Sequence, residues 1–137
     1  MLTKMKEFDE LLEVINRLFA PDGCPWDKQQ TLQSMKKHIL EEANEVVEAI
    51  DEGDKDHLLE EIGDLAIHVI SLSIMAKNDG LFSLADVLVM AKEKLLRRHP
   101  HVFSGLKVNS VEEVLENWKK IKKQEKDFKN TLYSTIF

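Results

Sequence analysis

Residues 58–75 constrain the fold more than any other part of the chain. Most of their apolar side chains recur at i, i+3, i+4 and i+7, which defines one face of an α-helix, and three isoleucines lie roughly on the opposite side. A helix that is apolar on two sides needs two hydrophobic partners, so we expect it at the centre of a helical fold. The polar stripe left between the two faces consists of Glu61, Asp64, His68 and Ser71.

Glu61 and Asp64 are the residues of this stripe whose burial would be most unfavourable. They lie three residues apart and therefore share a helical face, and no Lys or Arg occurs between residues 58 and 76 to pair with them. A carboxylate in an apolar environment is destabilising unless an ion pair or a metal ion compensates its charge. The stripe therefore predicts a cation supplied from outside the chain.

The preceding segment repeats the same spacing with Glu42 and Glu45. If the two segments form antiparallel helices joined at Gly53, both acidic pairs converge on one cleft, and a divalent ion would relieve their repulsion. Carboxylate sites favour Mg²⁺ or Mn²⁺ over zinc, and Mg²⁺ in such sites commonly takes substrate phosphate oxygens as further ligands. The pattern favours phosphate chemistry. The alternative is that the glutamates of residues 41–48 form an ordinary solvated face.

Hydrophobic periodicity along the rest of the chain predicts an all-α fold of about five helices, because no segment alternates as a β-strand does. A turn-rich loop is expected from about residue 20 to 30. Residues 1–127 are expected to form one domain and residues 128–137 a loosely held C-terminal tail. The expected helices cover about residues 8–19, 31–52, 55–77 and 83–98, and a fifth begins at about residue 110.

Composition excludes several classes of protein. A chain of 137 residues is large enough for one domain with its own core, and a net charge of −6 argues against a general nucleic-acid binder. No apolar run is long enough to span a membrane, and the first ten residues lack the apolar region of a secretory signal. Cys24 is the single cysteine, which excludes an internal disulfide and favours a cytoplasmic location.

Positive charges gather in the last third of the chain. Lys94 and Arg98 lie four residues apart on one helical face, and so do Trp118 and Lys122. Lys and Arg bind phosphate oxygens, and the face of a Trp suits a nucleobase, so the four residues together favour a nucleoside polyphosphate as ligand. The alternative is a set of solvated cations with the Trp in the core.

The expected loop contains a large aromatic residue, Trp26, directly after Cys24 and Pro25. Trp26 either stacks on a planar ligand such as a base, as part of a lid, or anchors the loop to the core. Cys24 has no adjacent cation that would stabilise a thiolate, so a cysteine nucleophile is not expected. His68 either contacts the acidic site or is a hydrogen-bonded histidine of the core.

Taken in order along the chain, these residues resemble a known family. Residues 41–45 (EEANE) and 61–64 (EIGD) fit the EExxE and ExxD signature of the all-α nucleoside triphosphate pyrophosphohydrolases. Residues 23–27, 97–103 and 118–122 are similar to blocks of the MazG branch of that family. The resemblance extends over about residues 8 to 126.

The resemblance implies an Mg²⁺-dependent hydrolase that splits nucleoside triphosphates into monophosphate and pyrophosphate, in housecleaning of the nucleotide pool. By motif position, Glu41 would orient the attacking water or complete the metal's ligand shell. The implied metal ligands, which are also catalytic residues with Glu41, are Glu42, Glu45, Glu61 and Asp64. The implied substrate-binding residues are Lys94, Arg98, Trp118 and Lys122.

The resemblance also implies a homo-oligomer, commonly a dimer with a four-helix core, which would cover the second apolar face formed by Ile67, Ile70 and Ile74. Some members carry two such domains in tandem, and this single copy looks more like the first of such a pair. Two alternatives follow. The chain is a helical oligomerisation or regulatory module with weak catalysis, or it hydrolyses another phosphoanhydride such as a signalling nucleotide.

Overall fold

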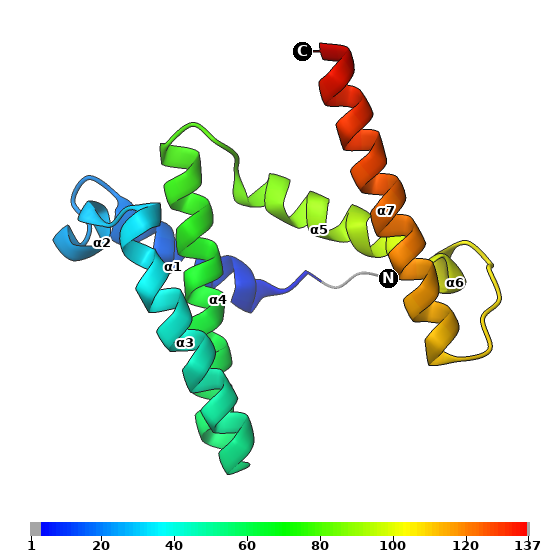
Figure 1. Cartoon of the computed structure of the whole chain (residues 1–137). Coiled ribbons are helices and arrows are strands. Elements are labelled where there is room, and N and C mark those ends of the chain that lie inside the picture. Colours follow the sequence, from blue (N-terminus) through cyan, green and yellow to red (C-terminus); the bar gives the residue numbers. More distant parts are fainter. Residues whose placement is uncertain (1–3, 137) are drawn as a thin grey trace. The chain divides into compact units, whose positions relative to one another are not determined.

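A computed structural model describes residues 4–136, and within them it contains seven α-helices and no β-strand (Figure 1). The prediction of an all-α fold is confirmed. Five helices match the expected ones, and two short helices, α2 and α6, occupy segments expected to be loop or helix end. The helices are α1 (Lys6–Phe19), α2 (Pro25–Gln29), α3 (Leu32–Glu52), α4 (Lys55–Asn78), α5 (Leu84–Arg98), α6 (Pro100–Phe103) and α7 (Val111–Ile136).

Both short helices begin with a proline in their first turn. Proline is well tolerated there, because the first backbone N–H groups of a helix have no intrahelical acceptor and the fixed φ angle of proline is already helical. In the sequence, Pro25 lies in the segment expected to be a loop, and Pro100 follows the expected end of a helix at residue 98. The structure shows that each proline instead starts a new helix.

The chain divides into two compact units, one up to Val87 and one from Leu88 onward. The first unit contains α1 to α4, and α3 packs extensively against α4. α1 also packs against α4, so α4 has a helical partner on more than one side, as its sequence predicted. The buried apolar residues of this unit are Ile15, Met35, Ala49, Ile70, Met75 and Ala76.

A tight reversal joins α3 to α4. Gly53 ends α3 with φ 69°, a left-handed conformation that glycine adopts without strain, and Asp54 caps α4. The Asp54 carboxylate accepts hydrogen bonds from the backbone N–H groups of Asp56 (3.0 Å) and His57 (3.2 Å). Because the reversal takes only two residues, the two helices lie antiparallel, and glutamates near the middle of each can face one another.

The apolar faces of α4 are assigned differently from the expectation. Ile70 is only 2% exposed and lies in the core of the first unit, whereas Leu59 and Ile62 are 69% and 53% exposed. The expectation that a second subunit covers the face of Ile67, Ile70 and Ile74 was wrong for Ile70, which this chain itself covers. Periodicity shows that a helix has two apolar sides, but the side that the chain itself covers depends on where α1 packs.

The second unit contains most of α5 together with α6 and α7. Ser83 and Asp86, which belong to the first unit, cap the start of α5, with the Asp86 N–H donating to Ser83 Oγ (3.2 Å) and the Ser83 N–H donating to Asp86 Oδ2 (2.8 Å). The bond from the Ser83 N–H, followed by the bond that Ser83 Oγ donates to Asp86 Oδ2 (2.9 Å), lowers the pKa of Asp86. At the start of α7, Glu113 N–H donates to Ser110 Oγ (3.2 Å), and Glu113 Oε2 accepts from Asn109 N–H (2.8 Å).

α7 continues through residues 128–136, which were expected to form a tail. The backbone of this segment is therefore helical, while the domain boundary at residue 127 stays a prediction and Phe137 lies outside the described residues. Among the described residues, no helix has the combination of length and apolar character needed to cross a bilayer.

Candidate functional site

The antiparallel pair α3–α4 brings the predicted metal ligands together. Carboxylate oxygens of Glu42, Glu45 and Glu61 lie within 4.8 Å of one another, and those of Glu60, Glu61 and Asp64 form a second such group. Glu61 belongs to both groups, so all four predicted ligands lie around one carboxylate. We call Glu42, Glu45, Glu61 and Asp64 the acidic cluster. Glu60 was not among the predicted residues.

Two members of the acidic cluster are buried and incompletely bonded. Glu42 is 8% and Glu61 6% exposed, and one oxygen of each, Glu42 Oε1 and Glu61 Oε2, is buried without a hydrogen-bond partner. A buried oxygen that lacks a partner loses its hydration without compensation, which is unfavourable for a neutral group and more so for a charged one. These two oxygens are suited to bind a cation.

The carboxyl groups of the acidic cluster act on one another's ionisation. The neighbouring Glu61 carboxyl group raises the pKa of Glu45. The neighbouring Glu42 carboxyl group, followed by burial, raises the pKa of Glu61. Carboxyl groups this close repel one another when ionised, so the cluster holds protons more tightly than isolated glutamates do. A divalent cation would take the place of such protons.

Two histidines of α4 contact the buried glutamates. His57 Nε2 lies 3.3 Å from Glu61 Oε1, and its Nδ1 lies 2.9 Å from Glu52 Oε2. This contact with Glu52 raises the pKa of His57. His68 Nε2 lies 3.7 Å from Glu42 Oε2, so of its two sequence interpretations the structure favours a contact with the site. His57 was not predicted as a site residue from the sequence, although its position four residues before Glu61 places both on one helical face.

Glu41 is the one predicted catalytic acid that lies outside both groups of closely spaced oxygens. Its exposed carboxylate pairs with His38, with Nδ1 and Oε2 3.5 Å apart. Adjacent residues of a helix point in directions about 100° apart, so Glu41 and Glu42 cannot share one face. The predicted role of Glu41 in orienting water or completing a metal shell stays a prediction.

Trp26 lies on α2 at the surface of the first unit. Its ring is 49% exposed and meets the ring of His38 edge-on, with centroids 5.7 Å apart. The turn before it requires a glycine, because a Cβ at Gly23 would lie 2.1 Å from the Leu18 carbonyl oxygen. Trp26 and His38 border an open cavity of about 550 Å³ that Lys36 and Lys37 also line. Half of the indole is therefore available to a ligand.

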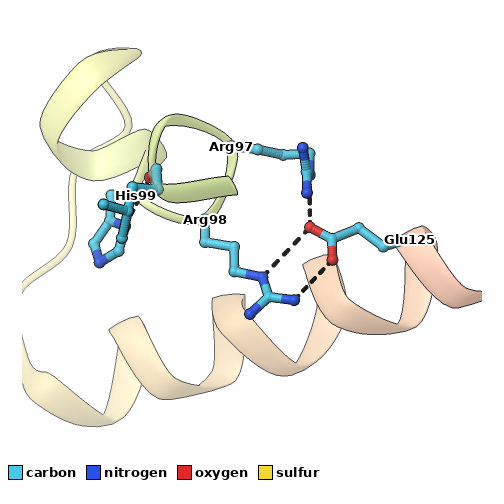
Figure 2. A network of polar contacts seen from close by, with 5 residues as sticks. Arg97, Arg98, His99 and Glu125 are labelled. Atoms are coloured by element: carbon cyan, nitrogen blue, oxygen red, sulfur yellow. Dashed lines mark hydrogen bonds and ion pairs between the residues drawn. The ribbon is translucent and has the colours of Figure 1, made fainter. Parts of the chain in front are cut away.

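In the second unit, one carboxylate joins two arginines (Figure 2). Glu125 Oε1 accepts from Arg97 Nε (2.6 Å) and Arg98 Nε (3.4 Å), and its Oε2 accepts from Arg98 Nη2 (2.9 Å). Arg98 first and then Arg97 lower the pKa of Glu125 to about 2. Two guanidinium groups share one negative charge, so this network keeps a net positive charge.

The other predicted substrate residues of this unit have different environments. Lys94 lines a cavity of about 910 Å³ together with Arg97 and Arg98. Trp118 meets the ring of His99 edge-on at 5.3 Å, and its Nε1 is buried without a hydrogen-bond partner. Lys122 is exposed. Trp118 is thus half-buried against a histidine, as expected if it belongs to the core. Its indole N–H has no hydrogen-bond acceptor.

Comparisons with known proteins agree with the all-α fold and identify the family. Residues 30–103 match the sequence profile of the MazG nucleotide pyrophosphohydrolase domain. That match spans α3, α4 and the arginines at the end of α5. The chain belongs to the MazG nucleotide pyrophosphohydrolase family, as the resemblance predicted.

Individual relatives are similar over most of this chain. A nucleoside triphosphate pyrophosphohydrolase of Escherichia coli K12 is 42% identical over 123 residues, which are 89% of this chain and 47% of that protein. The MazG nucleoside triphosphate pyrophosphohydrolase/pyrophosphatase of Thermotoga maritima is 40% identical over 90% of this chain and 47% of its own length. The protein YabN of Bacillus subtilis is 46% identical over 88% of this chain and 25% of its own length. The chain thus spans half or less of these relatives.

A solved structure shares the fold. The crystal structure of a mazG-related protein from Thermotoga maritima matches with a TM-score of 0.73 and 32% sequence identity. The match covers 84% of this chain and 98% of that chain. Almost the whole of the solved chain therefore takes part in the match.

Proposed function

We propose that this chain is a nucleoside triphosphate pyrophosphohydrolase, which converts a triphosphate and water into a monophosphate and pyrophosphate. The observation that carries the proposal is the acidic cluster with its two unpartnered, buried oxygens, Glu42 Oε1 and Glu61 Oε2. A helix pair with a purely structural role would gain stability by replacing these acids with apolar residues. Family membership and the names of the relatives from Escherichia coli and Thermotoga maritima support the same reaction.

The acidic cluster fits Mg²⁺, with Mn²⁺ as an alternative. All of its donors are carboxylates, and two of the oxygens are buried without a partner, which suits a hard divalent ion better than zinc. Such an ion, when bound, neutralises phosphate charge and activates water for attack. Glu42, Glu45, Glu61 and Asp64 would hold it. Glu45 is exposed, so it is the member that a substrate approaching from solvent meets first.

The proposed substrate contacts use cations and aromatic rings. Lys94, Arg98 and Lys122 would bind phosphate oxygens, while Trp118 and Trp26 would offer a ring to the base. Glu125 fixes Arg98 through Nε and Nη2, which holds the guanidinium plane in one orientation and keeps Nη1 outside the network. A fixed guanidinium loses less conformational entropy when it binds a phosphate than a free one does.

We also propose a homo-oligomer, with a dimer as its smallest form. α3 and α4 expose several large apolar side chains, and an apolar cavity of about 610 Å³ lies where the two helices meet near Gly53. An exposed apolar surface of this kind is typical of an interface between subunits. A second copy of α3–α4 would complete a four-helix core. The exposed residues are Leu40, Val47, Ile50, Leu59, Ile62 and Val69.

The proposed role is removal of unwanted nucleotides from the nucleotide pool. A cytoplasmic location stays a prediction, which rests on the single cysteine.

The test of the proposed reaction is incubation of the purified chain with each common ribo- and deoxyribonucleoside triphosphate, with Mg²⁺ or with a chelator, followed by separation of products. Monophosphate and pyrophosphate formed only with Mg²⁺ would support the proposal. A folded chain that binds Mg²⁺ and turns over none of them would favour a signalling nucleotide as substrate, or the oligomerisation module.

A further inference from the structure

Each buried glutamate of the acidic cluster has one oxygen against a histidine and the other oxygen without a partner. In Glu61, Oε1 lies 3.3 Å from His57 Nε2, while Oε2 is unpartnered. In Glu42, Oε2 lies 3.7 Å from His68 Nε2, while Oε1 is unpartnered. Glu42 belongs to α3 and Glu61 to α4, so the same arrangement of the two carboxylate oxygens occurs on both helices.

His57 is itself held in place. Its Nδ1 lies 2.9 Å from Glu52 Oε2, and Glu52 is the last residue of α3. Its backbone N–H donates to Asp54 at the start of α4. The ring therefore connects the end of α3 to the carboxylate of Glu61, and Glu52, His57 and Glu61 form a chain of polar contacts across the helix reversal. Such a connection limits rotation of the Glu61 carboxylate.

A carboxylate with one oxygen facing a histidine nitrogen presents its other oxygen to a metal ion. Mg²⁺ requires nearly octahedral geometry with short bonds and takes one oxygen from each carboxylate, whereas the larger Ca²⁺ readily takes both oxygens of one group. Groups that contact metal-binding side chains from behind fix their orientation, and their loss typically lowers metal affinity by about 10- to 100-fold. The two histidines are placed for this role.

We infer that His57 and His68 are positioning residues of the metal site, which present Glu61 Oε2 and Glu42 Oε1 as single-oxygen ligands and so favour Mg²⁺ over Ca²⁺. The inference rests on the proposed function, because it requires that the acidic cluster binds a divalent ion. It assigns no catalytic step to either histidine. Glu52 is assigned a supporting role, as the group that anchors His57.

The test is titration of the full-length chain with Mg²⁺ and, separately, with Ca²⁺ in a calorimeter, without nucleotide. His57→Ala and His68→Ala should each lower the affinity for Mg²⁺ by about tenfold or more, and the affinity for Ca²⁺ by less. His57→Gln keeps a donor toward Glu61 and should stay within about threefold of the unmodified chain. His101→Ala is the matched control, because His101 lies on α6 in the second unit and its ring packs on that of His99.

The outcomes separate the inference from the proposed function. An unmodified chain that binds neither ion would overturn the proposed metal site itself. An unmodified chain that binds Mg²⁺, with alanine variants of equal affinity and equal preference for Mg²⁺, would overturn the positioning role alone. If an alanine variant lost its cooperative thermal transition, His57→Leu and His57→Gln would be compared, since both fill the space of the ring. Equal Mg²⁺ affinity of those two would also overturn the role.

Discussion

Glu61 and Glu125 are both largely covered glutamates that face a neighbouring helix, but their surroundings are opposite. Glu61 faces other carboxylates, which raise its pKa, and one of its oxygens has no partner. Glu125 receives three hydrogen bonds from two arginines, which lower its pKa to about 2. Two arginines of the second unit therefore compensate the charge of Glu125, whereas no Lys or Arg pairs with the carboxylates of the acidic cluster among the described residues. A glutamate without such compensation indicates a missing partner, and a compensated one indicates a structural role.

The largest effect that this comparison predicts comes from Glu61→Gln. Loss of a ligand should reduce Mg²⁺-dependent turnover by more than about 100-fold, beyond the effect of residues that only support ligands. Because the amide removes a repelling charge, thermal unfolding of the metal-free chain should occur at the same or a higher temperature. Rate assays and calorimetry with Asp51→Asn, an exposed acid near the end of the neighbouring helix α3, as control would measure both. Full activity of Glu61→Gln would contradict the assignment of Glu61 as a metal ligand.

Glu125→Gln should have the opposite profile. Hydrogen bonds to charged groups contribute about 1.5–3 kcal/mol each in buried sites, and this carboxylate is 20% exposed, so we expect the free energy of unfolding to fall by about 1–3 kcal/mol. Urea titration measures the change, with Glu116→Gln on the exposed side of α7 as control. An unchanged free energy of unfolding would show that the network contributes nothing to stability.

The stabilisation that Glu125 provides should depend on pH. The ordinary pKa of a glutamate is 4.5, and that of Glu125 in the folded chain is about 2. A carboxyl group with a lowered pKa stabilises the fold fully above its unfolded value, and this contribution is lost as pH falls from about 4.5 toward 2. The difference in unfolding free energy between the unmodified chain and Glu125→Gln should therefore shrink over that range. Urea titrations at pH values on both sides of 4.5 would reveal it, and a constant difference would contradict the assignment.

The smallest effect concerns the two tryptophans, which lie in different units. Trp26 is half exposed, so Trp26→Ala should leave the thermal midpoint nearly unchanged, whereas loss of base stacking should raise KM by about fivefold or more. The half-buried Trp118 packs on His99, so Trp118→Ala should lower the thermal midpoint. Melting curves and steady-state kinetics of both variants measure this difference. A lower midpoint for Trp26→Ala would mean that Trp26 is a structural anchor.

Local patterns in the sequence predicted the parts of the molecule that depend on local spacing. The four carboxylates of the acidic cluster follow from two i, i+3 pairs and a short reversal at Gly53, and the structure brings them together. Glu125 could not be predicted in this way. Its partners lie 27 and 28 residues earlier, and only the packing of α5 and α7 brings them close.

Two further differences have the same physical origin. Burial of Ile70 depends on where α1 packs, which periodicity within α4 does not specify. The histidine contacts depend on which oxygen of each glutamate is already engaged, which is a matter of side-chain rotation rather than of spacing. Sequence patterns therefore predict which residues share a face, but not which partners they meet there.

The most direct test of the account is to follow the oxygen atom of the attacking water. The purified chain would hydrolyse its best triphosphate substrate with Mg²⁺ in water enriched in a heavy oxygen isotope, and mass spectrometry would locate the label. The account predicts label in the monophosphate and none in the pyrophosphate, with no product when a chelator replaces Mg²⁺. Label in pyrophosphate or inorganic phosphate, or equal turnover with the chelator, would contradict it.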